Sequence, residues 1–180
     1  CIDAVGIGFL FAPLFHPAMQ HAAAPRRELG VRTAFNLLGP LTNPASATHQ
    51  IIGVYDPSLT QILAEVLGAL GSHAALVFHG HGSLDELTTA GPNRISHLCE
   101  GSVRTFDFDP AAPEPAYGPA LPLRRAASGD LHGGDPAVNA GITRQILAGA
   151  KGPCRDIACL NAAAAIIAGG QVLNMSTLLD

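Results

Sequence analysis

The sequence is poor in charged side chains and carries no excess of basic ones. Charged residues make up 13% of the 180 residues and hydrophobic residues 48%, a composition that supports a large core and argues against disorder. The formal net charge of −4 gives no sign of a basic surface and so argues against a nucleic-acid-binding protein. The length suits one α/β domain.

The chain also lacks close cysteine pairs and long apolar runs. Its four cysteines are Cys1, Cys99, Cys154 and Cys159, and they form no CxxC pair. We therefore predict that the chain has no structural zinc site and that its thiols are reduced. The apolar run Ile2–Phe15 is too short to span a membrane. It has no basic start and no cleavage motif, and Asp3 interrupts it, so we expect no signal peptide. We expect a cytoplasmic protein with no membrane partner.

A βαβ unit is the clearest pattern in the middle of the chain. The β-rich run His49–Tyr55 is followed by the helix-start residues Asp56–Ser58. Leu59–Leu70 then repeats leucine, isoleucine and valine at helical spacing, and His73–His79 reads as a buried strand. A strand, a helix and a second strand in this order predict two parallel strands joined by a right-handed crossover.

Two adjacent acidic residues follow the second of these strands, in the loop Gly80–Glu86. Ligands of open α/β sheets bind beyond the carboxyl ends of the strands, which makes Asp85 and Glu86 candidates for chemistry. Mg²⁺ prefers one or two carboxylates together with waters and substrate phosphates. An acidic pair on a loop can equally be no more than a solvated surface. His79 and His81 flank Gly80, but no third ligand is placed near them, so we predict no metal site there.

Other elements are predicted by composition and turn residues. We expect the end of a helix over Cys1–Gly6 and a buried strand over Phe9–Ala12. Further along we expect a hairpin formed by Arg94–Leu98 and Val103–Phe108, followed by a proline-rich surface connection over Pro110–Pro122. We then expect a helix over Pro136–Leu147, capped by Asp135, and an alanine-rich helix over Asp156–Ala168.

The segment His16–Pro44 has the composition of a small-anion site. A helix-compatible run ends at Gly30 and carries Arg26 and Arg27, and a short helix or turn, Ala34–Leu38, breaks at Gly39-Pro40. An arginine fork matches a carboxylate, and a glycine lets a flat ligand approach the backbone. The alternative to an anion site is that Gly-Pro and Asn-Pro are ordinary turn residues of a loop and that the arginines complement a helix dipole.

The amino-acid sequences of several segments are specific to one protein family. GIGFLFAP, HPAM and RRELGVRTAFNLLGPLTNP, followed by GSLDEL, HGGDPAVNAGITRQILAG and RDIACLNAAAAI, resemble anthranilate phosphoribosyltransferase in this order from residue 4 to residue 168. The resemblance implies a three-layer α/β/α domain with a mainly parallel central sheet. It also implies transfer of 5-phosphoribose from phosphoribosyl pyrophosphate to anthranilate, with Mg²⁺, in tryptophan biosynthesis.

The resemblance also implies roles for individual residues. Arg26 would hold the anthranilate carboxylate, and His16, Pro13, Met19 and Gly39 would line the pocket of the aromatic substrate. The metal would be held by a pair already described as candidates, Asp85 and Glu86.

Residues 1–180 would form only part of the family's α/β domain, because the helical N-terminal domain and the first strands have no counterpart in the sequence. The phosphoribosyl pyrophosphate loop and the family's homodimer interface would be missing with them. We therefore expect the 180-residue chain to be inactive by itself. Two alternatives share the architecture: a nucleic-acid-binding relative without transferase activity, and a pyrimidine nucleoside phosphorylase relative.

Overall fold

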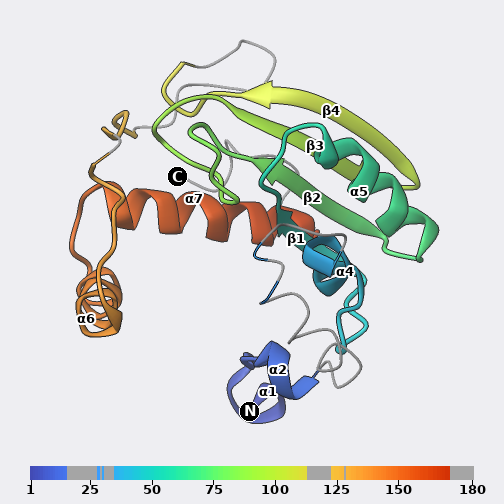
Figure 1. Cartoon of the computed structure of the whole chain (residues 1–180), viewed down its shortest axis with the longest axis horizontal. Helices are drawn as coiled ribbons and strands as arrows, with labels where there is room; N and C mark the ends of the chain where they lie inside the picture. Colours follow the sequence, from blue (N-terminus) through green and yellow to red (C-terminus); the bar gives the residue numbers. More distant parts are fainter. Residues whose placement is uncertain (16–27, 29, 31–34, 113–122, 128, 171–180) are drawn as a thin grey trace. The chain divides into compact units, whose positions relative to one another are not determined.

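The computed structural model in Figure 1 describes residues 1–15, 28, 30, 35–112, 123–127 and 129–170. The chain divides into two compact units, Cys1–Ala47 and Thr48–Asp180. Across the described ranges, no helix is both long enough and apolar enough to cross a membrane.

The first unit contributes short helices. Helix α1 spans Ile2–Val5 and ends at Gly6, whose φ of 76° is the left-handed conformation that glycine adopts without strain. This agrees with the helix end predicted over Cys1–Gly6. Helix α2 spans Ala12–Phe15.

The buried strand predicted over Phe9–Ala12 is wrong. Phe9 is 88% exposed and Phe11 is 51% exposed. Their rings stack with centroids 6.4 Å apart, and the chain enters α2 directly after Phe11. A short apolar run does not by itself distinguish strand from helix. The described part of residues 1–47 includes no strand with which this run could pair.

Helix α4 spans Phe35–Leu41, which confirms the helix predicted near Ala34–Leu38 but not its break at Gly39-Pro40. Pro40 lies inside the helix. The missing N–H of a proline removes one intrahelical hydrogen bond, which a short helix tolerates near its end. The hydroxyl of Thr42 donates to the Leu38 carbonyl at 2.9 Å and so continues the hydrogen bonding past the helix.

The second unit is built on one four-stranded sheet of order β1-β2-β3-β4: His49–Gly53, Ala74–His79, Asn93–Cys99 and Ser102–Phe108. Strands β1 and β2 are parallel and are joined by helix α5, Leu59–Ala69. The βαβ unit predicted from the sequence is therefore confirmed.

The α/β class is confirmed, but the four-stranded sheet is mixed and not mainly parallel. Strand β3 runs antiparallel to β2, and β4 antiparallel to β3. A parallel connection requires a crossover of a dozen or more residues, usually a helix. The chain between β2 and β3 instead forms the loop that carries Asp85 and Glu86.

The hairpin between β3 and β4 is confirmed. Its turn consists of Glu100 and Gly101, with φ values of 50° and 75°. Two consecutive residues with positive φ match the right-handed twist of the flanking strands, and glycine at the second position removes the steric cost.

Helices cover both faces of this sheet (Figure 1). On one face lies α5, whose Thr60 hydroxyl accepts a 3.0 Å hydrogen bond from the Ser96 hydroxyl of β3. On the other face lies α7, Pro153–Ala168, in a core of buried apolar side chains: Leu76, Phe78, Leu87, Ile95, Phe108, Leu160, Ala164 and Ala168. The alternation along β2 places successive side chains in these two layers.

The last two helices follow the predicted pattern. Helix α6 spans Pro136–Leu147, and the Asp135 side chain accepts a 2.9 Å hydrogen bond from the Val138 N–H, which confirms the predicted N-cap. Helix α7 begins three residues earlier than predicted, with Pro153 in its first turn. The predicted surface connection begins at Pro110, which is buried, and residues 113–122 lie outside the described part of the chain.

Candidate active site: the carboxylate loop after strand β2

The candidate site lies at the carboxyl end of the parallel strands. Strand β2 ends at His79, and the chain then forms residues 80–87, which we call the carboxylate loop. Asp85 and Glu86 are both exposed in this loop. Two exposed carboxylates at the carboxyl end of parallel strands can receive a cation from solvent.

A small hydrogen-bonded turn closes the start of the carboxylate loop. The Gly80 N–H donates to the Leu84 carbonyl at 2.8 Å, and the Leu84 N–H donates back at 3.2 Å. Between them, Gly82 and Ser83 have φ values of 80° and 63°. This pair of bonds fixes the backbone immediately before Asp85.

Two glycines allow the loop to lie directly on the strand ends. A Cβ at Gly53, the last residue of β1, would overlap the backbone carbonyl of Asp85. A Cβ at Gly80 would overlap the carbonyl of Glu86. Neither glycine has a positive φ, so the requirement is for space and not for an unusual backbone conformation.

The end of the loop is held by the side chain of Asn161 on α7. Its Oδ1 accepts a hydrogen bond from the Leu87 N–H at 3.0 Å, and its Nδ2 donates to the Leu87 carbonyl at 2.8 Å. Leu87 itself is fully buried in the core against α7. The residue that follows Glu86 is thus fixed through both its main chain and its side chain.

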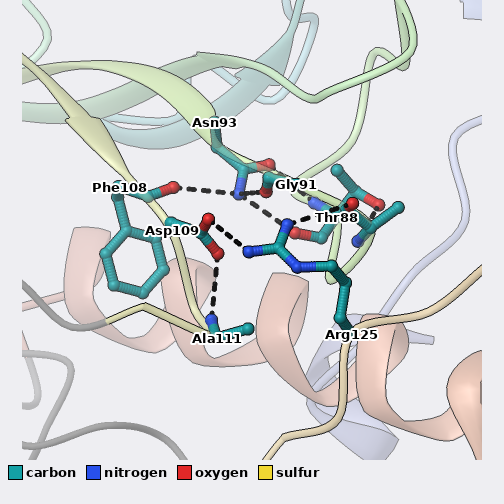
Figure 2. Close-up of polar contacts among 8 residues, drawn as sticks. Thr88, Gly91, Asn93, Phe108, Asp109, Ala111 and Arg125 are labelled. Carbon is teal, nitrogen blue, oxygen red and sulfur yellow. Dashed lines mark hydrogen bonds and ion pairs between the residues drawn. The ribbon is translucent and has the colours of Figure 1, made fainter.

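A second asparagine holds the segment beyond the loop (Figure 2). Asn93 is fully buried, and its Oδ1 accepts from the Thr88 N–H at 2.7 Å. Its Nδ2 donates to the carbonyls of Thr88, Gly91 and Phe108. A buried amide with all its partners satisfied specifies one backbone path, and here that path leads from the carboxylate loop into β3.

An ion pair lies beside this network (Figure 2). Arg125 Nη2 is 2.6 Å from Asp109 Oδ2, and Nη1 of the same guanidinium donates to the Ala90 carbonyl at 3.2 Å. Asp109 also accepts from the Ala111 N–H. These groups bond to one another and to backbone, so we assign them to the support of the chain between the carboxylate loop and β3 and of the chain after β4.

Hydrogen bonds near the end of β1 lower the pKa of Asp56 and fix the tautomer of His79. Hydrogen bonds from the Ser58 hydroxyl and then from the Ser58 N–H lower the pKa of Asp56, with a smaller contribution from nearby His79. His79 Nδ1 lies 2.8 Å from the Val54 carbonyl. Because a carbonyl only accepts, that ring nitrogen carries the proton.

The donor set of the carboxylate loop fits Mg²⁺. The described residues include no group of three His, Cys, Asp or Glu side chains that could form a complete protein cage for a metal. Mg²⁺ does not need one, because it keeps several waters and takes one or two carboxylates plus substrate phosphates. Asp85 and Glu86 are two exposed carboxylates on a backbone that is hydrogen-bonded on both sides, so they are the residues that would hold such an ion.

The other predicted site residues fall in the first unit or outside the described residues. Pro13 lies in α2, and Gly39 lies in α4, where a Cβ would meet nothing within 4 Å. Arg26, His16 and Met19 lie outside the described residues, as does all of the predicted helix that carries them except Glu28.

Sequence reasoning missed the residues that hold the carboxylate loop. Gly53 interrupts an otherwise β-branched and apolar run, which is a known signal for close backbone approach. Asn161 is a polar residue within an alanine-rich helix, and its position gave no indication of its partner. The pairing of Asn161 with Leu87 joins residues 74 positions apart, which no local pattern reveals.

Comparison with known proteins defines the class. Residues 1–177 match the glycosyl transferase family, a/b domain, and the chain belongs to this family. Its relatives include the anthranilate phosphoribosyltransferases of Moorella thermoacetica, 53% identical over 170 residues, and of Syntrophobacter fumaroxidans, 55% identical over 169 residues. Each match covers 94% of this chain and 48% of the relative. The resemblance seen in the sequence is confirmed.

Solved structures agree. The anthranilate phosphoribosyltransferase of Thermus thermophilus superposes with a TM-score of 0.86 at 42% identity, covering 99% of this chain and 50% of that one. The enzyme of Saccharomyces cerevisiae in complex with PRPP and Mg has a TM-score of 0.79 at 27% identity, covering 95% and 47%. The chain thus spans about half the length of the proteins it matches.

Proposed function

We propose that this chain provides the α/β part of an anthranilate phosphoribosyltransferase. The reaction transfers 5-phosphoribose from phosphoribosyl pyrophosphate to anthranilate, giving N-(5-phosphoribosyl)anthranilate and diphosphate, in the cytoplasmic synthesis of tryptophan. The observation that carries the proposal is identity of 53% and 55%, over 94% of this chain, with two proteins that bear this name.

The chemistry suits a site that positions its reactants. The anthranilate amine is a free base at neutral pH, so no strong general base is needed to create the nucleophile. The bond from ribose C1 to the amine nitrogen forms, the bond from C1 to diphosphate oxygen breaks, and the amine proton leaves to solvent. Holding the amine and C1 in line supplies much of the rate enhancement.

We assign the donor side of the site to the carboxylate loop. Mg²⁺ held there would neutralise charge on the departing diphosphate. Asp85 and Glu86 would supply its protein ligands, because they are exposed, adjacent and fixed by backbone contacts on both sides. The Saccharomyces cerevisiae relative with PRPP and Mg supports the choice of metal and donor.

We assign the acceptor side to the segment that includes Arg26. The Arg26 guanidinium would bind the anthranilate carboxylate through two parallel hydrogen bonds. His16, Pro13, Met19 and Gly39 would line the pocket of the ring. A relative from Saccharomyces cerevisiae in complex with 4-fluoroanthranilate supports a binding site for the aromatic acid in this family.

The test is a fluorescence assay on the full-length protein from its native cells. Anthranilate, phosphoribosyl pyrophosphate and Mg²⁺ should together give loss of anthranilate fluorescence, and omission of any one of them should abolish it. Phosphate-dependent cleavage of pyrimidine nucleosides, or retardation of DNA in a gel, without loss of anthranilate would contradict the proposal. The inactivity expected of the 180-residue polypeptide alone stays a prediction, which the same assay tests.

A further inference from the structure

Two hydrogen-bonded fastenings bracket the acidic pair. The first is the pair of hydrogen bonds between Gly80 and Leu84, at 2.8 and 3.2 Å. The second is the pair between the Asn161 amide and the main chain of Leu87, at 3.0 and 2.8 Å. The only residues between Leu84 and Leu87 are Asp85 and Glu86.

The second fastening requires an asparagine. A carboxamide presents an acceptor and a donor in one plane, which is what the N–H and carbonyl of a single residue demand. Asn161 Nδ2 also donates to the Ile157 carbonyl at 2.9 Å, so the amide is tied back to its own helix. Aspartate at this position would keep the acceptor but lose both donated bonds, and leucine would keep the shape but lose all three.

We infer that Asn161 is a positioning residue for the divalent cation of this site. It fixes the Leu87 backbone, and through it the direction in which Asp85 and Glu86 extend toward a cation bound with the pyrophosphate donor. This inference rests on the proposed function. It assigns to a residue of α7, whose amide bonds to the main chain of Leu87 and Ile157, control over the metal's carboxylate ligands.

A merely structural role would give a different result. If the amide only docks the loop onto α7, its loss lowers stability but leaves the affinity for cation unchanged. If it positions the carboxylates, the affinity falls as well, because partners that orient metal ligands typically account for about 10–100-fold in affinity.

Asn139 on α6 offers a matched control. Its Oδ1 accepts from the Gly134 N–H at 2.8 Å, and its Nδ2 donates to the Gly134 carbonyl at 3.0 Å. This is the same pair of bonds between an asparagine side chain and one backbone residue. It lies at an exposed position in a segment without the acidic pair, so the Asn139→Leu variant removes the same pair of bonds away from the carboxylate loop.

The experiment uses the full-length protein from its native cells and measures Mn²⁺ affinity with phosphoribosyl pyrophosphate present. The readout is the electron paramagnetic resonance signal of free Mn²⁺, corrected for the Mn²⁺ that the donor binds in the absence of protein. We expect Asn161→Leu to weaken binding about tenfold or more, Asn161→Asp to weaken it less, and Asn139→Leu to leave it unchanged. Thermal unfolding and the KM for anthranilate are measured on each variant, and we expect that KM to stay unchanged. Folded Asn161 variants with unaltered Mn²⁺ affinity would overturn the inference.

A measurement on the unaltered protein covers the case in which the variants do not fold. Binding of Mn²⁺ with the donor should slow hydrogen exchange of the Leu87 N–H, and an unchanged exchange rate would overturn the inference. Failure of the proposed function is seen separately, as absence of anthranilate transfer by the unaltered protein. Mn²⁺ that does not bind in the presence of the donor also contradicts the inference, because the acidic pair would then hold no cation.

Discussion

Gly53 lies directly against the main chain of Asp85, so that a side chain at the end of β1 would occupy the space of the Asp85 carbonyl. The end of β1 therefore determines how closely the carboxylate loop, which follows β2, packs against the sheet. Together with Gly80, it allows the carboxylate loop to rest on the sheet.

The Gly53→Ala substitution tests this contact. An added methyl must displace the Asp85 backbone, and overpacking of this kind typically costs about 1–3 kcal/mol. We expect the free energy of unfolding, measured in urea, to fall by about that amount. We also expect a higher Mg²⁺ concentration for half-maximal activity.

Gly141→Ala is the control for this substitution. Gly141 lies inside α6, and a Cβ there meets nothing within 4 Å. Alanine should therefore stabilise the helix by up to about 1 kcal/mol and leave the Mg²⁺ requirement unchanged. Equal behaviour of the two variants would show that the carboxylate loop does not depend on the space at Gly53.

The elements that the sequence predicts well are those with local signals. The βαβ unit over His49–His79 has strong periodicity and a helix start at Asp56–Ser58. The Asp135 cap is local too, because its side chain bonds to a backbone group three residues away. Such features depend on neighbours along the chain, which a sequence displays directly.

The features that sequence could not predict depend on distant partners. The antiparallel pairing of β2 with β3 depends on a connection without a crossover helix. The exposure of Phe9 reflects the absence of a pairing strand in the described part of residues 1–47. The role of Asn161 depends on contact with Leu87, which α7 reaches only in the folded structure.

His97 predicts a pH dependence of stability. Burial on the sheet face that carries α7 lowers the pKa of this imidazole below its usual value of 6.5, and its cross-strand partner on β4 is Arg104. As pH falls below about 6.5, the unfolded chain gains a proton at this position that the folded chain does not. The contribution of His97 to stability is therefore present above pH 6.5 and decreases as pH falls toward the pKa of the folded state.

The measurement is urea unfolding of His97→Gln and of unaltered protein across pH 8 to about 5. The variant should lose less free energy of unfolding on acidification. His132→Gln, at an exposed position, serves as the control and should follow the unaltered protein. A His97 variant with the same pH profile as the unaltered protein would contradict this account.

Arg26→Ala tests the acceptor side of the proposed site. Loss of hydrogen bonds from a charged group costs about 1.5–3 kcal/mol, and each 1.4 kcal/mol is about tenfold. We expect the KM for anthranilate to rise about ten- to a hundredfold, with a smaller effect on the KM for phosphoribosyl pyrophosphate. Arg27→Ala is the paired control, because the sequence predicts a helix here and neighbours on a helix point to different faces. An anthranilate KM that does not change would remove Arg26 from the site.

The central claim is that the carboxylate loop holds the cation of the sugar donor, and titration of activity with Mg²⁺ tests it most directly. Unaltered protein is compared with Asp85→Asn and Glu86→Gln, at saturating anthranilate and phosphoribosyl pyrophosphate. We predict that each variant needs at least about tenfold more Mg²⁺ for half-maximal rate. Variants that fold and show the Mg²⁺ dependence of the unaltered protein would contradict the claim.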